Sequence, residues 1–274
     1  MPLLTCCLIL RLCFQGGILV ASVRLPGSAT VPGLWPAVWT MGNLGRAGYG
    51  ASLEGLWPYA YETCDVGTLA NQTDPTVPDP DTDLLGDCVF NQKHFTKSLS
   101  FLPGQRLSAC TCPGEDHPGP QLSDGTFKGR SAPEIDLFEA QVSGTKGMTV
   151  SQSAQLAPFN AYYKLLAPPQ LFTDQTIMNT YTGEVTQQAA SAVTPTDQQA
   201  VQDLADGSTG VFSEYGIEYL PGDDGYIEWI NNGNPTWRLG PDTLAADPVS
   251  KIARRPVTSE PMYIIMNVGI SRSE

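Results

Sequence analysis

Apolar and polar residues alternate with a period of two along much of this chain, and short apolar runs are bounded by Gly and Pro. Both patterns predict β-strands. The predicted strands occupy residues 17–26, 33–41, 133–140, 149–157, 212–220, 226–231 and 261–269. Between 212–220 and 226–231, the segment Pro221–Gly225 has the composition of a hairpin turn. We therefore expect an all-β chain with many turns.

One segment favours a helix instead. Residues 195–206 are polar, with Thr196 in the capping position and Gly207 as a stop signal. We expect a short helix there, at the periphery of the domain.

The predicted strand at 133–140 contains three carboxylates within six residues, in Glu134-Ile135-Asp136-Leu137-Phe138-Glu139. Side chains alternate along a strand, so Glu134 and Asp136 share one face. Simple alternation places Glu139 on the other face. A single bulged residue at Leu137 or Phe138 would return Glu139 to the acidic face, and bulges are common beside active sites.

This arrangement suits cleavage of a bond between two sugars. With such a bulge, Glu134 and Glu139 could bring their carboxyl groups to about 5–5.5 Å, the separation typical of retaining glycosidases. Glu134 would be the nucleophile and Glu139 the acid and base. The charge of Asp136 would raise the pKa of a neighbouring carboxyl. The alternative is a solvated acidic face, although like charges on one strand face repel each other.

Composition narrows the classes of partner. The chain has 274 residues and a formal net charge of −13, which argues against nucleic acid and against anionic membrane surfaces. Only two histidines are present, which disfavours Ser-His-Asp chemistry. We expect neither a metal nor a cofactor.

Residues 43–130 form a long excursion that is rich in Gly, Pro, Asp and Thr. Its four cysteines are Cys64, Cys88, Cys110 and Cys112. They could form two disulfides in three alternative pairings, which would indicate an oxidising compartment. A metal site is the competing interpretation, but Cys110 and Cys112 lack the usual two-residue spacing. Asn71 begins a glycosylation sequon in the same excursion.

The N-terminus allows two interpretations. Residues 1–12 are an apolar segment that is either signal-like or an artefact of the gene model. The remainder, 13–274, is the expected domain, with residues 13–23 as one of its own strands.

Three segments occur in an order found in a known family: Leu34–Trp39, Glu134–Glu139 and Met262–Asn267. Together they resemble glycoside hydrolase family 16, the laminarinase-like β-jelly rolls. The match is closest to the fungal β-1,6-glucan synthesis-associated proteins. The segments that carry this closer resemblance are Thr40–Gly50, Leu56–Tyr59, Leu107–Pro120 and Tyr215–Tyr219.

The resemblance implies a concanavalin A-like jelly-roll sandwich with a long Cys-containing insertion, here truncated at both ends. It assigns Glu134 as nucleophile, Asp136 as assisting carboxylate and Glu139 as acid/base. Family members look like membrane-anchored proteins of the secretory pathway or plasma membrane, with the domain on the lumenal or extracellular side. The anchor is expected to be missing from this chain.

Sugar rings stack on aromatic side chains, and the chain has five tryptophans as candidates: Trp35, Trp39, Trp57, Trp229 and Trp237. Core packing is the competing role for each. Alternation puts Trp35 and Trp39 on one face, where they could line a cleft wall together. Asn267 resembles a family Asn that faces the cleft, and Asn43 and His94 are weaker candidates.

The sequence therefore predicts a retaining β-glucan glycosidase or transglycosylase of the fungal cell wall, with β-glucan as its partner. A non-catalytic β-glucan-binding or scaffold protein is the alternative, and an inactive truncated product is a third reading.

Overall fold

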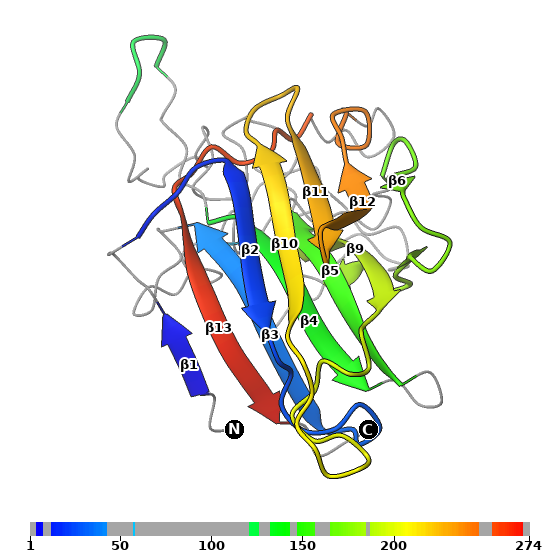
Figure 1. The fold of residues 1–274 in the computed structure, drawn as a ribbon. Helices are drawn as coiled ribbons and strands as arrows, with labels where there is room; N and C mark the ends of the chain where they lie inside the picture. The colour runs from blue at the N-terminus through cyan, green and yellow to red at the C-terminus, as the bar shows by residue number, and fades with distance from the viewer. Residues whose placement is uncertain are drawn as a thin grey trace, which may run out of the picture.

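The computed structural model describes residues 4–7, 12–42, 57, 121–125, 132–142, 147–156, 165–184, 187–246 and 254–270. Every regular element among these residues is a β-strand, and every pairing between the strands is antiparallel. The strands form two sheets that lie one in front of the other in Figure 1. The predicted all-β jelly-roll sandwich is confirmed.

The first sheet has eight strands. Its order is β1 (Leu4–Cys7), β13 (Met262–Ile270), β3 (Leu34–Gly42), β4 (Glu134–Val142), β5 (Met148–Leu156), β9 (Gln187–Pro195) and β7 (Ile177–Met178), and β8 (Gly183–Glu184) also pairs with β9. The acidic strand β4 therefore lies inside the sheet, between β3 and β5.

The second sheet has five strands. Its order is β2 (Gly17–Val23), β10 (Ser213–Leu220), β11 (Tyr226–Asn231), β12 (Asn234–Leu239) and β6 (Gln170–Leu171). Leu220 pairs with Tyr226 across the predicted turn, so the hairpin is confirmed. A second tight turn, Asn232-Gly233, joins β11 to β12 with φ of 48° and 76°. This Asn-Gly signal was overlooked in the sequence, although it is typical of two-residue hairpins.

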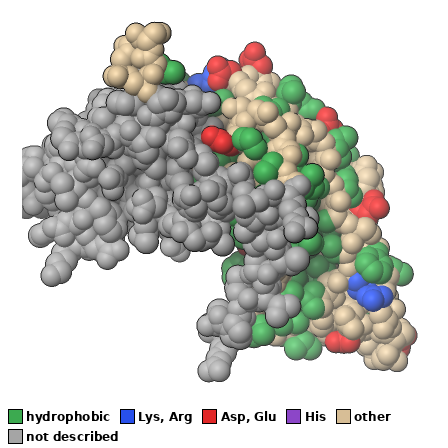
Figure 2. Space-filling model, turned by 90° about the vertical axis from the view of Figure 1, so that its left-hand side faces the viewer, with side chains coloured by type: hydrophobic (Ala, Val, Ile, Leu, Met, Phe, Trp, Pro, Cys, Tyr) green, Lys and Arg blue, Asp and Glu red, His purple; other side chains and the backbone are tan. Residues whose placement is uncertain are grey.

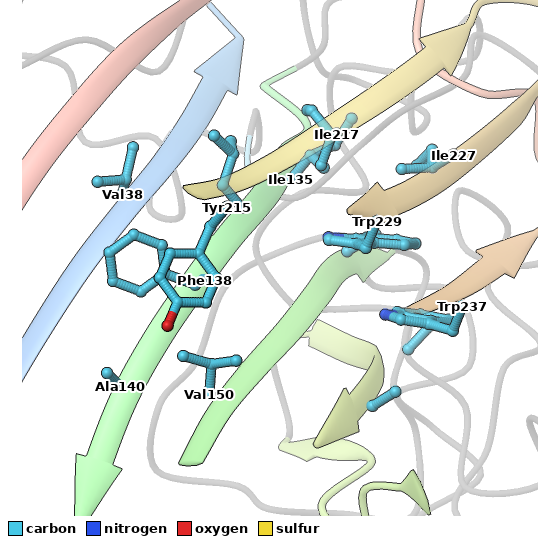
Figure 3. Packing of buried hydrophobic residues seen from close by; sticks show 14 of the residues in the cluster. Val38, Ile135, Phe138, Ala140, Val150, Tyr215, Ile217, Ile227, Trp229 and Trp237 are labelled. Atoms are coloured by element: carbon cyan, nitrogen blue, oxygen red, sulfur yellow. The ribbon is translucent and has the colours of Figure 1, made fainter. Parts of the chain in front are cut away.

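The hydrophobic core fills the space between the sheets (Figure 3). The rings of Trp229 and Trp237 stack with their centroids 4.0 Å apart and their planes at 4°. The ring of Phe138 of β4 packs against the ring of Tyr215 of β10, with their centroids 4.6 Å apart. Both tryptophans are fully buried, so their candidacy as sugar contacts is wrong and core packing is their role.

The prediction of a helix at 195–206 is wrong. This segment is a series of turns after β9, and Leu25 forms a parallel bridge with Val201. The Leu25 N–H donates to the Ala200 carbonyl at 2.9 Å, and the Gln198 side chain donates to the Met148 carbonyl at 2.8 Å. Backbone and side-chain groups are thus bonded to residues far away in the sequence, and these tertiary contacts override a weak local preference.

Residues 4–7 of the apolar N-terminal segment form β1 and pair with β13, with Leu4 opposite Val268. Cys13 is exposed and forms no disulfide. The other predicted features of the excursion fall outside the described residues: Asn43, Asn71, His94, Cys64, Cys88, Cys110 and Cys112.

The described surface is poor in positive charge. Figure 2 shows scattered acidic side chains and few Lys or Arg on this side of the described surface. In the part of the chain that the structure describes, no helix is long and apolar enough to cross a membrane.

Candidate active site

A β-bulge in β4 brings the three carboxylates to one face. Asp136 pairs with Ser153 of β5, whereas Glu139 pairs with Ser151, so two residues of β4 lie opposite Gln152 alone. On the other side, Val38 of β3 pairs with Phe138. Leu137 is therefore the extra residue, and the bulge predicted at Leu137 or Phe138 is confirmed.

The carboxylates lie at a cleft of about 610 Å³ on the face of the eight-stranded sheet that points away from the five-stranded sheet. Glu134 and Glu139 line the cleft, and Asp136 lies buried between them with 1% of its surface exposed. The other described residues that line it are Trp35, Trp57, Gln141, Thr149, Ser151, Ser153, Gln155, Asn179, Tyr181, Ala189, Ser191 and Val193. Most of those on β5 and β9 are small and polar, which leaves room for a ligand beside the carboxylates.

Glu134 and Asp136 form a coupled pair. Trp57 Nε1 donates to Glu134 Oε2 at 2.5 Å, and the two carboxyls share a hydrogen bond. Burial raises the pKa of Glu134 well above its usual range, and the charge of Asp136 raises it further. Burial and the neighbouring charge thus favour the protonated form of Glu134.

Asp136 accepts two further hydrogen bonds, from Ser153 Oγ at 2.6 Å and from Gln155 Nε2 at 3.1 Å. Burial raises the pKa of Asp136, while the bonds from Ser153, Gln155 and Glu134 lower it. Because hydrogen bonds to a carboxylate stabilise its charged form, these bonds favour the negative charge on Asp136.

Glu139 is the second partly buried acid in the cleft. Burial raises its pKa to about 8, with a further contribution from the charge of Asp136. Hydrogen bonds with Trp35 and Ser151 act in the opposite direction. At neutral pH Glu139 is therefore mostly protonated and able to give a proton to a bound group.

Only some of the predicted sugar contacts lie at the cleft. Trp35 lines the cleft with 41% of its surface exposed, and Trp57 lines it beside Glu134. Trp39 has the same strand parity as Trp35, as expected, but its Nε1 donates to Asn267 Oδ1 at 2.7 Å. These two predicted contacts therefore bind each other, and among the described residues neither lines the cleft.

Tyr181 and Asn179 were missed in the sequence. Tyr181 lines the cleft with 44% of its surface exposed. Its backbone N–H donates to the Asn179 side chain at 3.1 Å, and Asn179 donates to Ser191 of β9 at 3.3 Å. The flanking strands are two residues long, too short for a periodic pattern to reveal them.

Comparisons with known proteins agree with one another on a family. The family model described as "Beta-glucan synthesis-associated protein SKN1/KRE6/Sbg1" matches residues 9–273. The Saccharomyces cerevisiae protein "Beta-glucan synthesis-associated protein KRE6" is 41% identical over 270 residues, which cover 96% of this chain and 33% of that protein. The Candida albicans protein "Beta-glucan synthesis-associated protein SKN1" is 39% identical over 269 residues, covering 96% of this chain and 32% of the relative. The chain thus spans about a third of the length of these relatives.

Among solved structures, the catalytic domain of an endo-1,3-beta-glucanase (laminarinase) from Thermotoga petrophila is similar, with a TM-score of 0.42 and 16% identity. The similarity covers 97% of this chain and 57% of that one. The laminarinase from Rhodothermus marinus gives a TM-score of 0.41 and 15% identity, covering 97% and 59%.

Proposed function

The chain belongs to the SKN1/KRE6/Sbg1 family of β-glucan synthesis-associated proteins, and from that premise we propose that it is a retaining β-glucan glycosidase or transglycosylase. Its role would be the synthesis or remodelling of fungal cell-wall β-glucan, including β-1,6-glucan. The observation that carries this proposal is the bulge of β4, which brings Glu134, Asp136 and Glu139 to one face beside a cleft.

The reaction has two steps, each with a role for the cleft carboxyls. In the first, an oxygen of Glu134 attacks the anomeric carbon, the glycosidic bond breaks, and Glu139 gives its proton to the departing oxygen. In the second, Glu139 takes a proton from water or from a glucan hydroxyl. The activated oxygen then attacks the same carbon and releases Glu134, so the configuration is retained.

The electrostatics support different tasks for Glu134 and Glu139. Glu139, whose pKa is about 8, is protonated at neutral pH, as a general acid must be. Nucleophilic attack needs Glu134 ionised, so the proton shared by the pair must reside on Asp136 at that step. Positive charge that develops on the sugar favours this transfer, because it stabilises the ionised form of Glu134.

The cleft also has groups suited to holding sugar rings. The exposed rings of Trp35 and Tyr181 offer stacking surfaces for the apolar faces of glucosyl units. Three further residues remain predicted sugar contacts: Asn43, and the hydrogen-bonded pair Trp39 and Asn267. A cleft of this volume lies in the range usual for small-molecule sites.

We place the domain on the lumenal or extracellular side of the secretory pathway or plasma membrane, with membrane association expected as in the family. Two features of the sequence support this, the sequon at Asn71 and the four cysteines of the excursion. A mobility shift after endoglycosidase treatment, absent in Asn71→Gln, would test it. An unchanged mobility would contradict glycosylation at this site.

A mechanism-based label tests the proposed chemistry. The chain is incubated with a β-glucosyl oligosaccharide that carries fluorine at carbon 2 and a fluoride leaving group, and its intact mass is then measured. We expect a covalent adduct that maps to Glu134 and is absent in Glu134→Gln. A folded chain that forms no adduct at any pH would contradict the retaining mechanism.

The alternative, a non-catalytic β-glucan-binding protein, has one observation in its favour. Burial and Asp136 raise the pKa of Glu134 well above its usual range, and a protonated Glu134 can donate to a sugar hydroxyl but cannot attack carbon. Binding of β-glucan oligosaccharides by calorimetry, without adduct formation in the labelling experiment, would favour this alternative.

A further inference from the structure

Buried side chains on the core side of β4 form hydrogen bonds with the backbone of the bulge. Three consecutive carbonyls of β4, those of Ile135, Asp136 and Leu137, each accept a hydrogen bond from a side chain. The donors are Thr40 Oγ1 at 2.9 Å, Trp229 Nε1 at 2.7 Å and Gln152 Nε2 at 3.0 Å, in the same order. These three side chains are fully buried, and none of them is among the residues that line the cleft.

Two of the three donors, Gln152 and Trp229, are themselves fixed by the five-stranded sheet. Gln152 also donates to Asn231 Oδ1 of β11 at 2.9 Å, and its own Oε1 accepts from Thr236 Oγ1 of β12 at 2.7 Å. Trp229 belongs to β11 and stacks on Trp237 of β12. The contacts at the bulge therefore link the five-stranded sheet to the strand that carries the carboxylates.

This network disfavours the regular alternative in which β4 has no bulge. A bulge disturbs the hydrogen-bonded ladder locally, and a buried carbonyl left without a partner costs about 1–3 kcal/mol. Trp229 and Gln152 supply partners at the bulge itself. Without the bulge, Glu139 would have the parity of Ile135 and Leu137 and would point into the core.

We propose that Trp229 and Gln152 are positioning residues that hold the β4 bulge and thereby set Glu139 against Glu134 and Asp136. The effect expected on the reaction rate rests on the proposed glycosyl transfer. The effect expected on the position of Glu139 does not. The two residues act through the β4 backbone and touch no substrate.

The stacked tryptophans provide a matched pair of variants. Both are fully buried, but Trp237 Nε1 has no hydrogen-bond partner among the described residues. Trp229→Phe and Trp237→Phe therefore remove similar packing, and only the first removes a bond to β4. We expect Trp229→Phe to slow adduct formation by roughly 100-fold, the effect of a displacement of about 1 Å at a reacting group. We expect Trp237→Phe to remain within about threefold of the parent chain, since its ring keeps its place.

A second measurement does not depend on activity. The titration of the Glu139 carboxyl is followed by carbon NMR in the full chain. In Trp229→Phe its pKa should fall from about 8 toward its usual range, because Glu139 moves from Asp136 and from its buried position. In Trp237→Phe the pKa should be unchanged. Equal rate losses and equal titrations in the two variants would overturn the proposal.

Thr236 gives a further pair should Trp229→Phe fail to fold. Thr236→Val removes the hydroxyl that fixes the Gln152 amide, and we expect about tenfold slower labelling, which is ~1.4 kcal/mol in the barrier. Thr236→Ser keeps the hydroxyl and should recover the parent rate within about threefold. If Thr236→Val keeps the labelling rate and the Glu139 pKa of the parent chain, the inference is contradicted. If the parent chain forms no adduct, the proposed function fails, and the Glu139 titrations alone decide on the bulge.

Discussion

The two faces of β4 are opposite in character, one acidic and one apolar. On the cleft face, burial raises the pKa of Glu134, Asp136 and Glu139, so each would be more easily ionised in the unfolded chain. On the core face, Ile135, Leu137 and Phe138 are almost completely buried, and each such side chain contributes about 1.5–3 kcal/mol. One strand thus offsets the cost of its acidic face by packing its other face, which is a common arrangement at functional sites.

The strongest way to break the cleft face is Glu134→Gln. This variant keeps shape and removes the nucleophile, so we expect glycosyl transfer to fall by about 1,000-fold or more. The initial rate on β-glucan oligosaccharides measures the loss. The control is Glu228→Gln, a carboxylate of the five-stranded sheet that lies 3.6 Å from Arg238, which should retain the parent rate. A Glu134→Gln rate within tenfold of the parent would exclude Glu134 as nucleophile.

Phe138→Ala breaks the core face. Loss of a buried Phe leaves a cavity beside Tyr215 and should lower the free energy of unfolding by about 3–5 kcal/mol, measured by chemical denaturation. Phe212→Ala is the matched control, because Phe212 is 60% exposed and its loss should change stability by less than about 1 kcal/mol. Equal losses in the two variants would contradict the core assignment.

The pH dependence of stability sharpens the contrast. Glu139 has a folded pKa of about 8 against an ordinary value of 4.5, so between these values the folded state holds a proton that the unfolded state has lost. Stability should therefore fall as pH rises from 4.5 to 8, by at most about 1.4 kcal/mol per pH unit for this group, and level off above 8.

Denaturation series from pH 4.5 to 9 measure this slope in the parent chain and in Glu139→Gln, where it should be shallower. An identical slope in both would show that Glu139 titrates normally. Activity in the parent chain should also decline as pH rises through about 8, because Glu139 then loses its proton.

The smallest expected effect comes from Trp35→Phe. The hydrogen bond with Trp35 lowers the pKa of Glu139, so its loss should move the alkaline limb of activity upward by about half a pH unit. A pH profile of kcat measures this shift, and Trp237→Phe is the control, since Trp237 lies in the core. A shift downward would contradict this hydrogen bond.

Features of the fold that depend on neighbouring residues along the chain were predictable, whereas features that depend on contacts between distant residues were not. Strand alternation revealed seven of the longer strands and, with the spacing of the carboxylates, the bulge at Leu137 or Phe138. β9 gave no clear alternation, and the Asn232-Gly233 turn before β12 was present but overlooked. The prediction of a helix at 195–206 was wrong because its capping and stop signals are local, whereas Leu25 and Met148, both distant in the sequence, bind the segment.

The candidate site shows the same division. Residue types and alternation were enough to place Glu134, Asp136 and Glu139 together, because a bulge is a local change in a local period. The five tryptophans could not be sorted in this way, since Trp35 at the cleft and Trp229 in the core both lie on alternating strands. Tyr181 lies between strands too short to show a period at all.

The sequence by itself therefore determined the β-strands, the composition of the acidic face and the family to which these motifs belong. Only the tertiary structure decided which side chains are buried, that the carboxyls of Glu134 and Asp136 share a hydrogen bond, and that Trp229 and Gln152 bind the backbone of the bulge. The physical reason is that alternation is set by neighbouring residues along the chain. Desolvation and hydrogen bonding across the sandwich depend on residues such as Asp136 and Trp229, which are 93 positions apart.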